Sequence, residues 1–234
     1  MGAFPSYASA ESQKTQPQAQ LMFGAFYSNG QNESVSTTNS EIIGFPVGLS
    51  YQDNRWSASV FTSYLRTYRY DQVKLNKPVS GMGDTFLSVG YDLMQAPWAT
   101  LSLNHKLPTG SVDNGTSTGK SDTGVQLDYF SSLSDTQSIF SSLSYKVTGK
   151  VDGVDMKDPI FASVGLSQSI SASTYIGASL DYNQSIYKSV SDTTGVTVFS
   201  GVQVDKRRQL FFSGSYDSSK NYQFGINFSL QLLQ

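Results

Sequence analysis

The sequence contains no cysteine, a single histidine and no long apolar run. The lack of cysteine excludes disulfides, thiol nucleophiles and thiolate metal sites. No stretch approaches the about 18–20 consecutive apolar residues of a transmembrane helix, which excludes an α-helical membrane protein. The net charge of −2 gives no electrostatic reason to expect nucleic acid as a partner.

Charged residues are also scarce, at 15% of the 234 residues. A soluble domain usually has about a quarter of its residues charged. Ser, Thr, Gly, Asn and Gln take their place here. We therefore expect much of the exterior of the protein to be hidden from water.

The N-terminus has no basic segment followed by an apolar one and a small-residue cleavage site. Because export across the inner membrane requires such a signal peptide, we expect the chain to be a mature form with an added initiator Met. Residues 1–19 are polar and rich in Gln and Ser, and they predict a disordered periplasmic tail. The alternative is a segment folded into the lumen of a barrel as a partial plug.

Strict alternation of apolar and small polar residues starts at Gln20 and continues to the end of the chain, which is typical of strands. Leu101 and Leu103 are one example, and Phe224, Ile226 and Phe228 are another. Tight turns and long loops alternate between these segments. The tight turns are near 52–55, 94–97, 134–137, 171–173 and 205–208, and the long loops are near 28–40, 71–83, 108–122, 149–158 and 188–194.

This pattern predicts an all-β fold, a transmembrane antiparallel up-and-down β-barrel of about twelve strands over residues 20–234, with short periplasmic turns and longer extracellular loops. An even number of strands places both termini on the periplasmic side. The expected location is the bacterial outer membrane, with lipopolysaccharide and phospholipid around the barrel.

The register follows from the chemistry of the two faces. The face opposite the apolar one is small and uncharged, which suits a wet interior, and Lys or Arg on the lipid face at mid-depth would cost about 2–4 kcal/mol each. We therefore expect Leu103, Val164 and Leu180 to face lipid, and the residues that follow each of them, Asn104, Gly165 and Asp181, to face the lumen. Aromatic residues near turns predict a girdle at the membrane interface: Tyr51, Trp56, Trp98, Tyr175 and Tyr216.

The predicted lumen face carries a few charges and several phenylalanines. The charges are either a structural network of ion pairs or a constriction that selects solutes. The rings either pack the interior or form an apolar path for aromatic solutes, beside which Lys106 or Lys146 could orient a hydroxyl or carboxylate. The candidate residues are Asp92, Lys106, Asp128, Lys146, Asp181, Phe86, Phe130, Phe140, Phe161, Phe199 and Phe211.

His105 is the single histidine, and it falls on the apolar register near a loop. A catalytic dyad or metal site would need further partners, so the sequence predicts no catalytic residue, no metal site and no cofactor. We expect His105 to lie at the membrane interface.

The last strand, residues 223–230, resembles the signal by which outer-membrane barrels are recognised by the barrel-assembly machinery. Gln223, Gly225, Phe228 and Leu230 match its polar, glycine, aromatic and large apolar positions. The match ends four residues before the C-terminus rather than at it.

Three short internal segments carry a second resemblance, over about residues 80–150. They are Gly81-Met82-Gly83-Asp84, Lys106-Leu107-Pro108-Thr109-Gly110 and Tyr145-Lys146-Val147-Thr148-Gly149. They resemble the outer-membrane proteins of the MetA pathway of phenol degradation, which implies transport by analogy.

Two functional hypotheses remain. The first is a narrow channel or transporter for small apolar or aromatic solutes. The second is a closed barrel that acts as a structural or adhesin-type protein through its extracellular loops. An outer-membrane enzyme is less favoured because the sequence lacks the paired catalytic motifs of the known families.

Overall fold

The computed structural model describes residues 17–31, 38–71, 74–75 and 78–233, and all of its regular elements are β-strands. The strands are β1 (Gln18–Gln31), β2 (Thr38–Asp53), β3 (Trp56–Asp71), β4 (Lys74–Leu75), β5 (Val79–Met82), β6 (Thr85–Gln95), β7 (Trp98–Leu107), β8 (Asp122–Ser132), β9 (Gln137–Val147), β10 (Ile160–Ser171), β11 (Thr174–Asn183), β12 (Thr193–Gln203), β13 (Arg208–Asp217) and β14 (Tyr222–Leu233).

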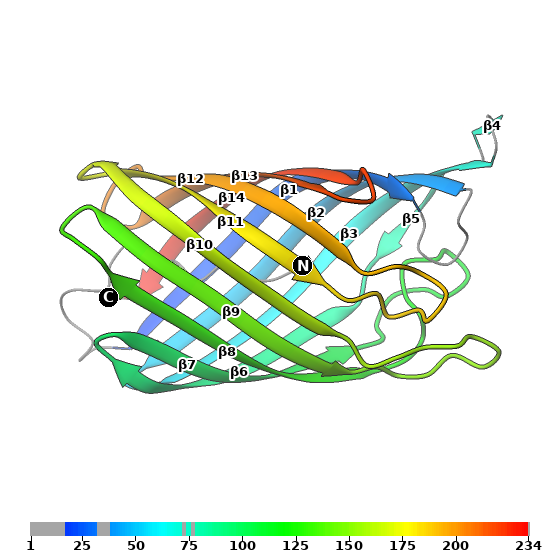
Figure 1. Ribbon diagram of the computed structural model, residues 1–234, viewed down its shortest axis with the longest axis horizontal. Helices are drawn as coiled ribbons and strands as arrows, with labels where there is room; N and C mark the ends of the chain where they lie inside the picture. The colour runs from blue at the N-terminus through cyan, green and yellow to red at the C-terminus, as the bar shows by residue number, and fades with distance from the viewer. Residues whose placement is uncertain (1–16, 32–37, 72–73, 76–77, 234) are drawn as a thin grey trace.

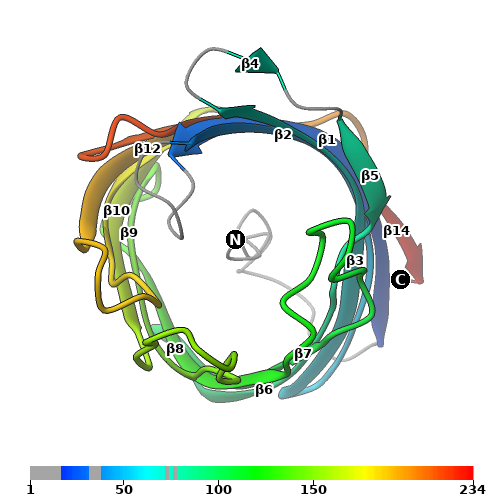
Figure 2. The same ribbon diagram turned by 90° about the vertical axis from the view of Figure 1, so that its right-hand side faces the viewer.

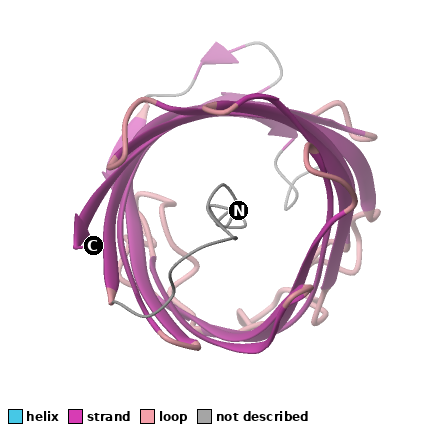
Figure 3. Cartoon of the chain, turned by 90° about the vertical axis from the view of Figure 1, so that its left-hand side faces the viewer, coloured by secondary structure: helices cyan, strands magenta, loops and turns pink. Residues whose placement is uncertain are grey.

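These strands form one closed antiparallel barrel (Figure 1). Each long strand pairs with its neighbours in the chain, and β1 pairs with β14 to close the ring, which Figures 2 and 3 show from its two ends. The two-residue β4 pairs only with the last two residues of β3, and β5 and β6 share one place because both pair with β3. Twelve places around the barrel remain, which confirms the predicted fold and strand number.

The connections differ between the two ends of the barrel. Short turns join the strands at one end, which we call the short-turn end, and most of the longer loops lie at the other, the long-loop end (Figure 1). The connection between β13 and β14, residues 218–221, is a short exception at the long-loop end. The predicted loop over 28–40 is too long, because β1 continues to Gln31 and β2 begins at Thr38.

The predicted N-terminal tail is also two residues too long. β1 begins at Gln18, where the backbone already pairs with β2 at Gln52. Most of the predicted tail, residues 1–16, lies outside the described residues. Within the described part of the chain, no helix has the length and apolar character needed to cross a membrane.

The apolar side chains face outward, not into a core. Leu103, Val164 and Leu180 are 55%, 48% and 64% exposed, as the register predicted. Buried apolar side chains are few among the described residues, namely Pro46, Ala99, Phe130, Phe140, Met156 and Pro159. An eight-stranded barrel is about wide enough to be filled by its own side chains, so twelve strands enclose a wider interior. The outward apolar belt is the surface expected of a barrel in lipid.

The predicted aromatic girdle is only partly correct. Tyr51, Trp56 and Tyr216 do lie on the outer surface, at 43%, 59% and 57% exposure. Trp98 and Tyr175 face the lumen instead, since Trp98 is paired with the inward Phe130 and Tyr175 with the inward Gly201. The physical reason is the two-residue period of a strand: both residues stand an even number of positions from inward neighbours, and closeness to a turn does not change the face.

Candidate functional site: the lumen wall and its long-loop mouth

The inner wall can be followed from strand to strand, because directly paired residues of antiparallel strands point to the same face. All of the predicted lumen residues lie on the inward face: Asp92, Lys106, Asp128, Lys146, Asp181, Phe86, Phe130, Phe140, Phe161, Phe199 and Phe211. Asn104, Gly165 and Asp181 share that face, which confirms the predicted register. Strand pairing thus puts these residues on one face, and their role as a pathway stays a prediction.

Five inward aromatic residues gather on one part of the wall, and we call them the aromatic lining: Phe130, Phe140, Tyr175, Phe199 and Phe211. Phe199 stands at the centre, with its ring centroid 5.6 Å from that of Phe140, 5.8 Å from Phe211 and 6.3 Å from Tyr175. Phe130 is paired with Phe140 on the adjacent strand. These distances are those of favourable aromatic pairs.

The other two predicted rings lie apart from this group. Phe86 is paired with Lys106 near the long-loop end and is 46% exposed. Phe161 lies beneath the Lys146 ammonium, with 5.4 Å between the nitrogen and the ring centroid. The six predicted rings and Tyr175 therefore form one group of five and two isolated members.

Glycines on neighbouring strands hold the rings of the lining against the wall. A Cβ atom on Gly165 would overlap the Phe140 ring, one on Gly177 the Phe199 ring, and one on Gly201 the Tyr175 ring. Each ring thus covers the bare backbone of the strand beside it, as aromatic residues do for glycines in sheets. The lining follows the wall and does not extend across the bore.

Two carboxylates lie in the wall between the barrel ends. Asp128 accepts hydrogen bonds from the Gln126 amide, at 2.9 Å to each oxygen. Asp181 accepts them from the hydroxyls of Ser179 and Thr197, at 2.9 and 2.7 Å. Their hydrogen-bond donors are therefore neutral.

A third inward carboxylate lies at the short-turn end. Asp92 accepts hydrogen bonds from the Trp98 indole, at 3.0 Å, and from the Thr100 hydroxyl, at 2.7 Å, and it is 3% exposed. A buried carboxylate with several donors fixes the side chains around it. This contact fixes the indole of the inward Trp98.

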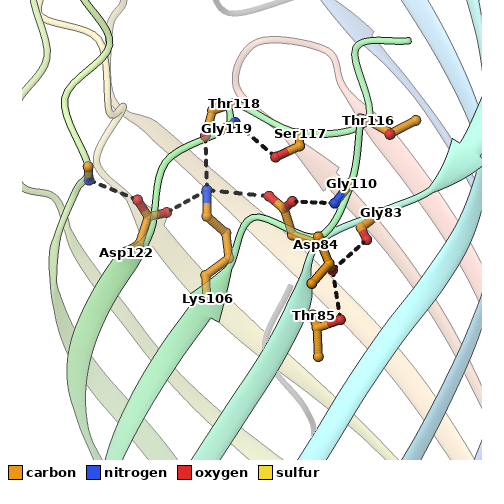
Figure 4. Close-up of polar contacts among 12 residues, drawn as sticks. Gly83, Asp84, Thr85, Lys106, Gly110, Thr116, Ser117, Thr118, Gly119 and Asp122 are labelled. Atoms are coloured by element: carbon orange, nitrogen blue, oxygen red, sulfur yellow. Dashed lines mark hydrogen bonds and ion pairs between the residues drawn. The ribbon is translucent and has the colours of Figure 1, made fainter. Parts of the chain in front are cut away.

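A cluster of ion pairs lies at the long-loop end, and we call it the mouth cluster: Asp84, Lys106 and Asp122 (Figure 4). The Lys106 ammonium is 3.0 Å from an Asp122 oxygen and 3.5 Å from an Asp84 oxygen. It also donates a hydrogen bond to the Thr118 hydroxyl, at 3.1 Å. The three charged side chains are only 9–12% exposed, so the cluster is largely shielded from water.

The mouth cluster fixes the loop between β7 and β8, residues 108–121, which reaches inward over the bore (Figure 2). The Gly110 amide donates to Asp84 at 3.2 Å (Figure 4). Further along the loop, the Thr116 hydroxyl donates to the Met82 carbonyl at 2.8 Å. The loop is therefore anchored both at its base and beyond it, and it narrows the long-loop mouth.

The three short segments that resemble the phenol-degradation family meet at this cluster. Asp84 belongs to the first segment and Lys106 to the second. From the third segment, the Gly149 amide donates to Asp122 at 2.9 Å, and the Lys146 ammonium lies 3.8 Å from the same carboxylate. For the two lysines, the structural network is thus the correct interpretation of the lumen charges.

Sequence reasoning missed several residues of this wall. Asp84 and Asp122 lie next to or within predicted loops, and only their contacts with Lys106 reveal them as part of the wall. Phe26 and Phe61 are inward too, paired with Gly44 and Gly48. For these two rings a signal was present, since they alternate with outward residues along their own strands.

His105 lies on the outer face near the long-loop end, and its Nδ1 is 2.8 Å from the Thr123 hydroxyl. That position agrees with the expected interface placement. Within the described ranges, no three His, Asp or Glu side chains come together as metal ligands.

The residues of the predicted assembly signal lie on β14, the strand that closes the barrel. Gln223 and Gly225 face inward, whereas Phe228 and Leu230 face outward. The Phe228 ring is 5.0 Å from that of Phe23 on β1, so this segment contributes to the closing contact. Its recognition by the assembly machinery stays a prediction.

Comparison with known proteins identifies the fold. No protein-family profile and no curated protein sequence match the chain. Among solved structures, an outer-membrane channel from Pseudomonas putida F1 matches with a TM-score of 0.77 and 14% identity, over 99% of this chain and 100% of that one. The KdgM porin matches at 0.60 and 10% identity, over 90% and 98% of the two chains.

A third match is the CymD monoaromatic hydrocarbon channel, with a TM-score of 0.55 and 9% identity, over 96% of this chain and 90% of that one. At these identities the likeness concerns the fold. The chain has the closed-barrel fold of outer-membrane channels.

Proposed function

We propose that the protein is an outer-membrane channel through which small apolar or aromatic solutes pass. The observation that carries this proposal is the aromatic lining, which follows the wall of a barrel too wide to be filled by side chains. Stacking on such rings is worth about 0.5–1.5 kcal/mol per pair. That is enough to favour an aromatic solute and weak enough to release it.

The structural neighbours support a channel without choosing the solute. One is described as a monoaromatic hydrocarbon channel and another as a porin. They are channels and porins rather than enzymes, and His105 points away from the lumen. We further propose that the outward apolar belt contacts lipopolysaccharide and phospholipid, and that assembly proceeds through the barrel-assembly machinery.

The first experiment asks whether solutes cross. Protein reconstituted in liposomes is tested with nicotinamide, a small neutral aromatic compound, and with erythritol, a neutral non-aromatic compound of nearly the same mass. We expect nicotinamide to enter faster than erythritol after subtraction of protein-free vesicles. If neither solute nor any ion crosses faster than in protein-free vesicles, the channel proposal falls and the closed barrel that acts through its loops replaces it.

The second experiment asks whether the lining is the path. Phe130→Ala with Phe199→Ala removes two inward rings, and Phe212→Ala with Phe224→Ala is the matched control, because both of these rings are outward and exposed. We expect the first pair to lower nicotinamide uptake about threefold or more, the equivalent of one lost ring contact. Equal uptake by the two variants would mean that the inward rings only pack the wall.

A further inference from the structure

Carboxylates recur along one line of paired residues that crosses the inner wall. The line passes through Asp92, Thr100, Asp128, Ser142, Ser163, Asp181, Gly195 and Asp217, on consecutive strands from β6 to β13. Its four acidic members, Asp92, Asp128, Asp181 and Asp217, are the carboxylate row. Asp92 lies near the short turn that ends β6, and Asp217 ends β13 at the long-loop end. The row therefore crosses the wall from one mouth to the other.

The members of the row are close enough for their fields to overlap. Adjacent strands lie about 4.8 Å apart, so carboxylate-bearing positions two strands apart are separated by about 10 Å and those three strands apart by about 14 Å. The field of each carboxylate extends over a screening length of about 8 Å at physiological salt, so the fields of two neighbours overlap in the gap between them. Charges of one sign on a confined wall also concentrate counter-ions near them. A cation that leaves one carboxylate thus enters the field of the next.

Three members of the row, Asp128, Asp181 and Asp217, have no ion pair among those described. The donors to Asp128 and Asp181 are the neutral groups described above. Asp217 accepts from the backbone amides of Ser219 and Asn221 and from the Asn221 side chain, at 2.9, 3.1 and 3.1 Å. Of the described ion pairs, none includes Asp128, Asp181 or Asp217.

The positively charged side chains on the described part of the inward face lie away from the carboxylate row. Its lysines are Lys106 and Lys146, and both lie against Asp122 in or beside the mouth cluster. Lys106 is also paired with Asp84. The lysines therefore do not offset the charge of the row. The sequence predicts that they could orient a hydroxyl or carboxylate of a solute, but their ion pairs already occupy them.

We propose, on the basis of the channel function above, that the lumen prefers cations to anions, and that aromatic solutes with a positive charge pass faster than those with a negative one. The aromatic lining lies directly beside the row. Phe130 is two positions from Asp128 on β8, and Phe199 is two positions from Thr197, one of the two hydroxyl donors to Asp181. A cationic aromatic solute can place its ring on the lining and its charge at the row.

The test measures ion selectivity in planar bilayers across a KCl gradient. We expect the permeability for potassium to exceed that for chloride about threefold or more, because a confined wall with charges of one sign concentrates counter-ions. Asp128→Asn with Asp181→Asn should bring the ratio close to one while conductance remains. The control, Asp135→Asn with Asp152→Asn, changes the net charge equally at exposed sites in a turn and a loop and should retain the ratio.

A second arm uses solutes with permanent charges, which do not cross lipid by themselves. Benzyltrimethylammonium should enter liposomes faster than benzenesulfonate through the wild-type protein, and the difference should disappear in the Asp128→Asn, Asp181→Asn variant. A channel that conducts without cation preference, or whose preference the variant retains, overturns this inference and leaves the channel function intact. Absence of any conductance overturns both.

Discussion

The inner wall of the barrel has two regions of different character. Strands β6 to β13 form a charged wall, which carries the mouth cluster, the carboxylate row and the aromatic lining. Strands β14, β1, β2 and β3 form a neutral wall, where no charged side chain faces inward among those the structure describes. Small residues such as Gly24, Gly44, Pro46 and Gly48 take up much of this face.

The two walls differ in role: the neutral wall contains the seam that closes the barrel, and the charged wall contains the groups proposed to select solutes. The β1–β14 seam, where the two ends of the chain meet, lies in the neutral wall and is closed by backbone pairing and by contacts such as that between Phe23 and Phe228. The charges lie on strands that are joined by short connections and pair with their chain neighbours. Among the described side chains, those that give the inner wall its charge therefore lie on one part of the ring, from β6 to β13.

The largest effect should come from breaking the charged wall at its mouth. Lys106→Met leaves Asp84 and Asp122 shielded and without their shared cation, which should cost about 3–5 kcal/mol of the free energy of unfolding. Urea unfolding in lipid vesicles measures this. Lys188→Met is the control: its pair with Asp155 is exposed, so the loss should be about 0–1 kcal/mol. Similar losses in the two variants would contradict a structural role for the mouth cluster.

The next effect distinguishes the two faces of the charged wall. Leu180→Arg places a charge in lipid and should cost about 2 kcal/mol, within the depth-dependent range for barrels. Asp181→Ala should cost less, because it removes hydrogen bonds in a wet lumen. The folded fraction on an unboiled gel compares the two variants. Spin labels test the register directly: if oxygen reached position 181 and not position 180, the assignment of faces on β11 would be wrong.

A smaller effect is expected when one carboxylate is moved from the charged wall to the neutral wall. Asp128→Asn with Asn227→Asp moves one carboxylate from β8 to β14 and keeps the net charge of the lumen. Asn227 is six strands from Asp128, about 29 Å along the wall, which is well beyond the screening length. We expect the double variant to regain less than half of the cation preference that Asp128→Asn alone loses, as measured by the reversal potential. Full recovery would mean that total charge, and not the row, decides.

The smallest effect concerns charges outside both walls. In the loop before β12, hydrogen bonds from Lys157 and then Tyr182 lower the pKa of Asp192 below its ordinary 3.8. Because the folded state favours the ionised carboxylate, its contribution to stability is present above pH 3.8 and disappears as the pH falls through the lowered pKa. The urea midpoints of the wild type and Asp192→Asn should differ slightly at pH 7 and converge in acid. A difference that persisted in acid would contradict this assignment.

The sequence was sufficient for the barrel and for most of its register. The two-residue period, together with the small and uncharged character of the opposite face, assigns Leu103, Val164 and Leu180 to the outside. Trp98 and Tyr175 were misassigned because closeness to a turn was given more weight than this period. Counting back from Leu101 would have placed Trp98 inward.

The mouth cluster and the carboxylate row were beyond sequence reasoning for a different reason. Both depend on register between strands: Asp128 and Asp181 are far apart in the chain, and only the pairing through Ser142 and Ser163 aligns them. The loop over 108–121 has no period at all, so its anchoring by Asp84 could not be read from the pattern. Alternation specifies the face of a residue, but not its neighbours around the ring.

Gly201, beneath Tyr175 of the aromatic lining, makes the calibre of the bore adjustable by a single substitution. The atoms nearest to a Cβ at this position all belong to the Tyr175 side chain, so alanine there must turn that ring away from the wall and into the passage. At Gly165 and Gly177 a Cβ would also overlap a backbone carbonyl of the paired strand, that of Ala178 or Leu166, and would disturb the pairing itself. The width of the passage can therefore change at one position while the strands keep their number and pairing, which gives such barrels a route to new solute sizes without a new fold.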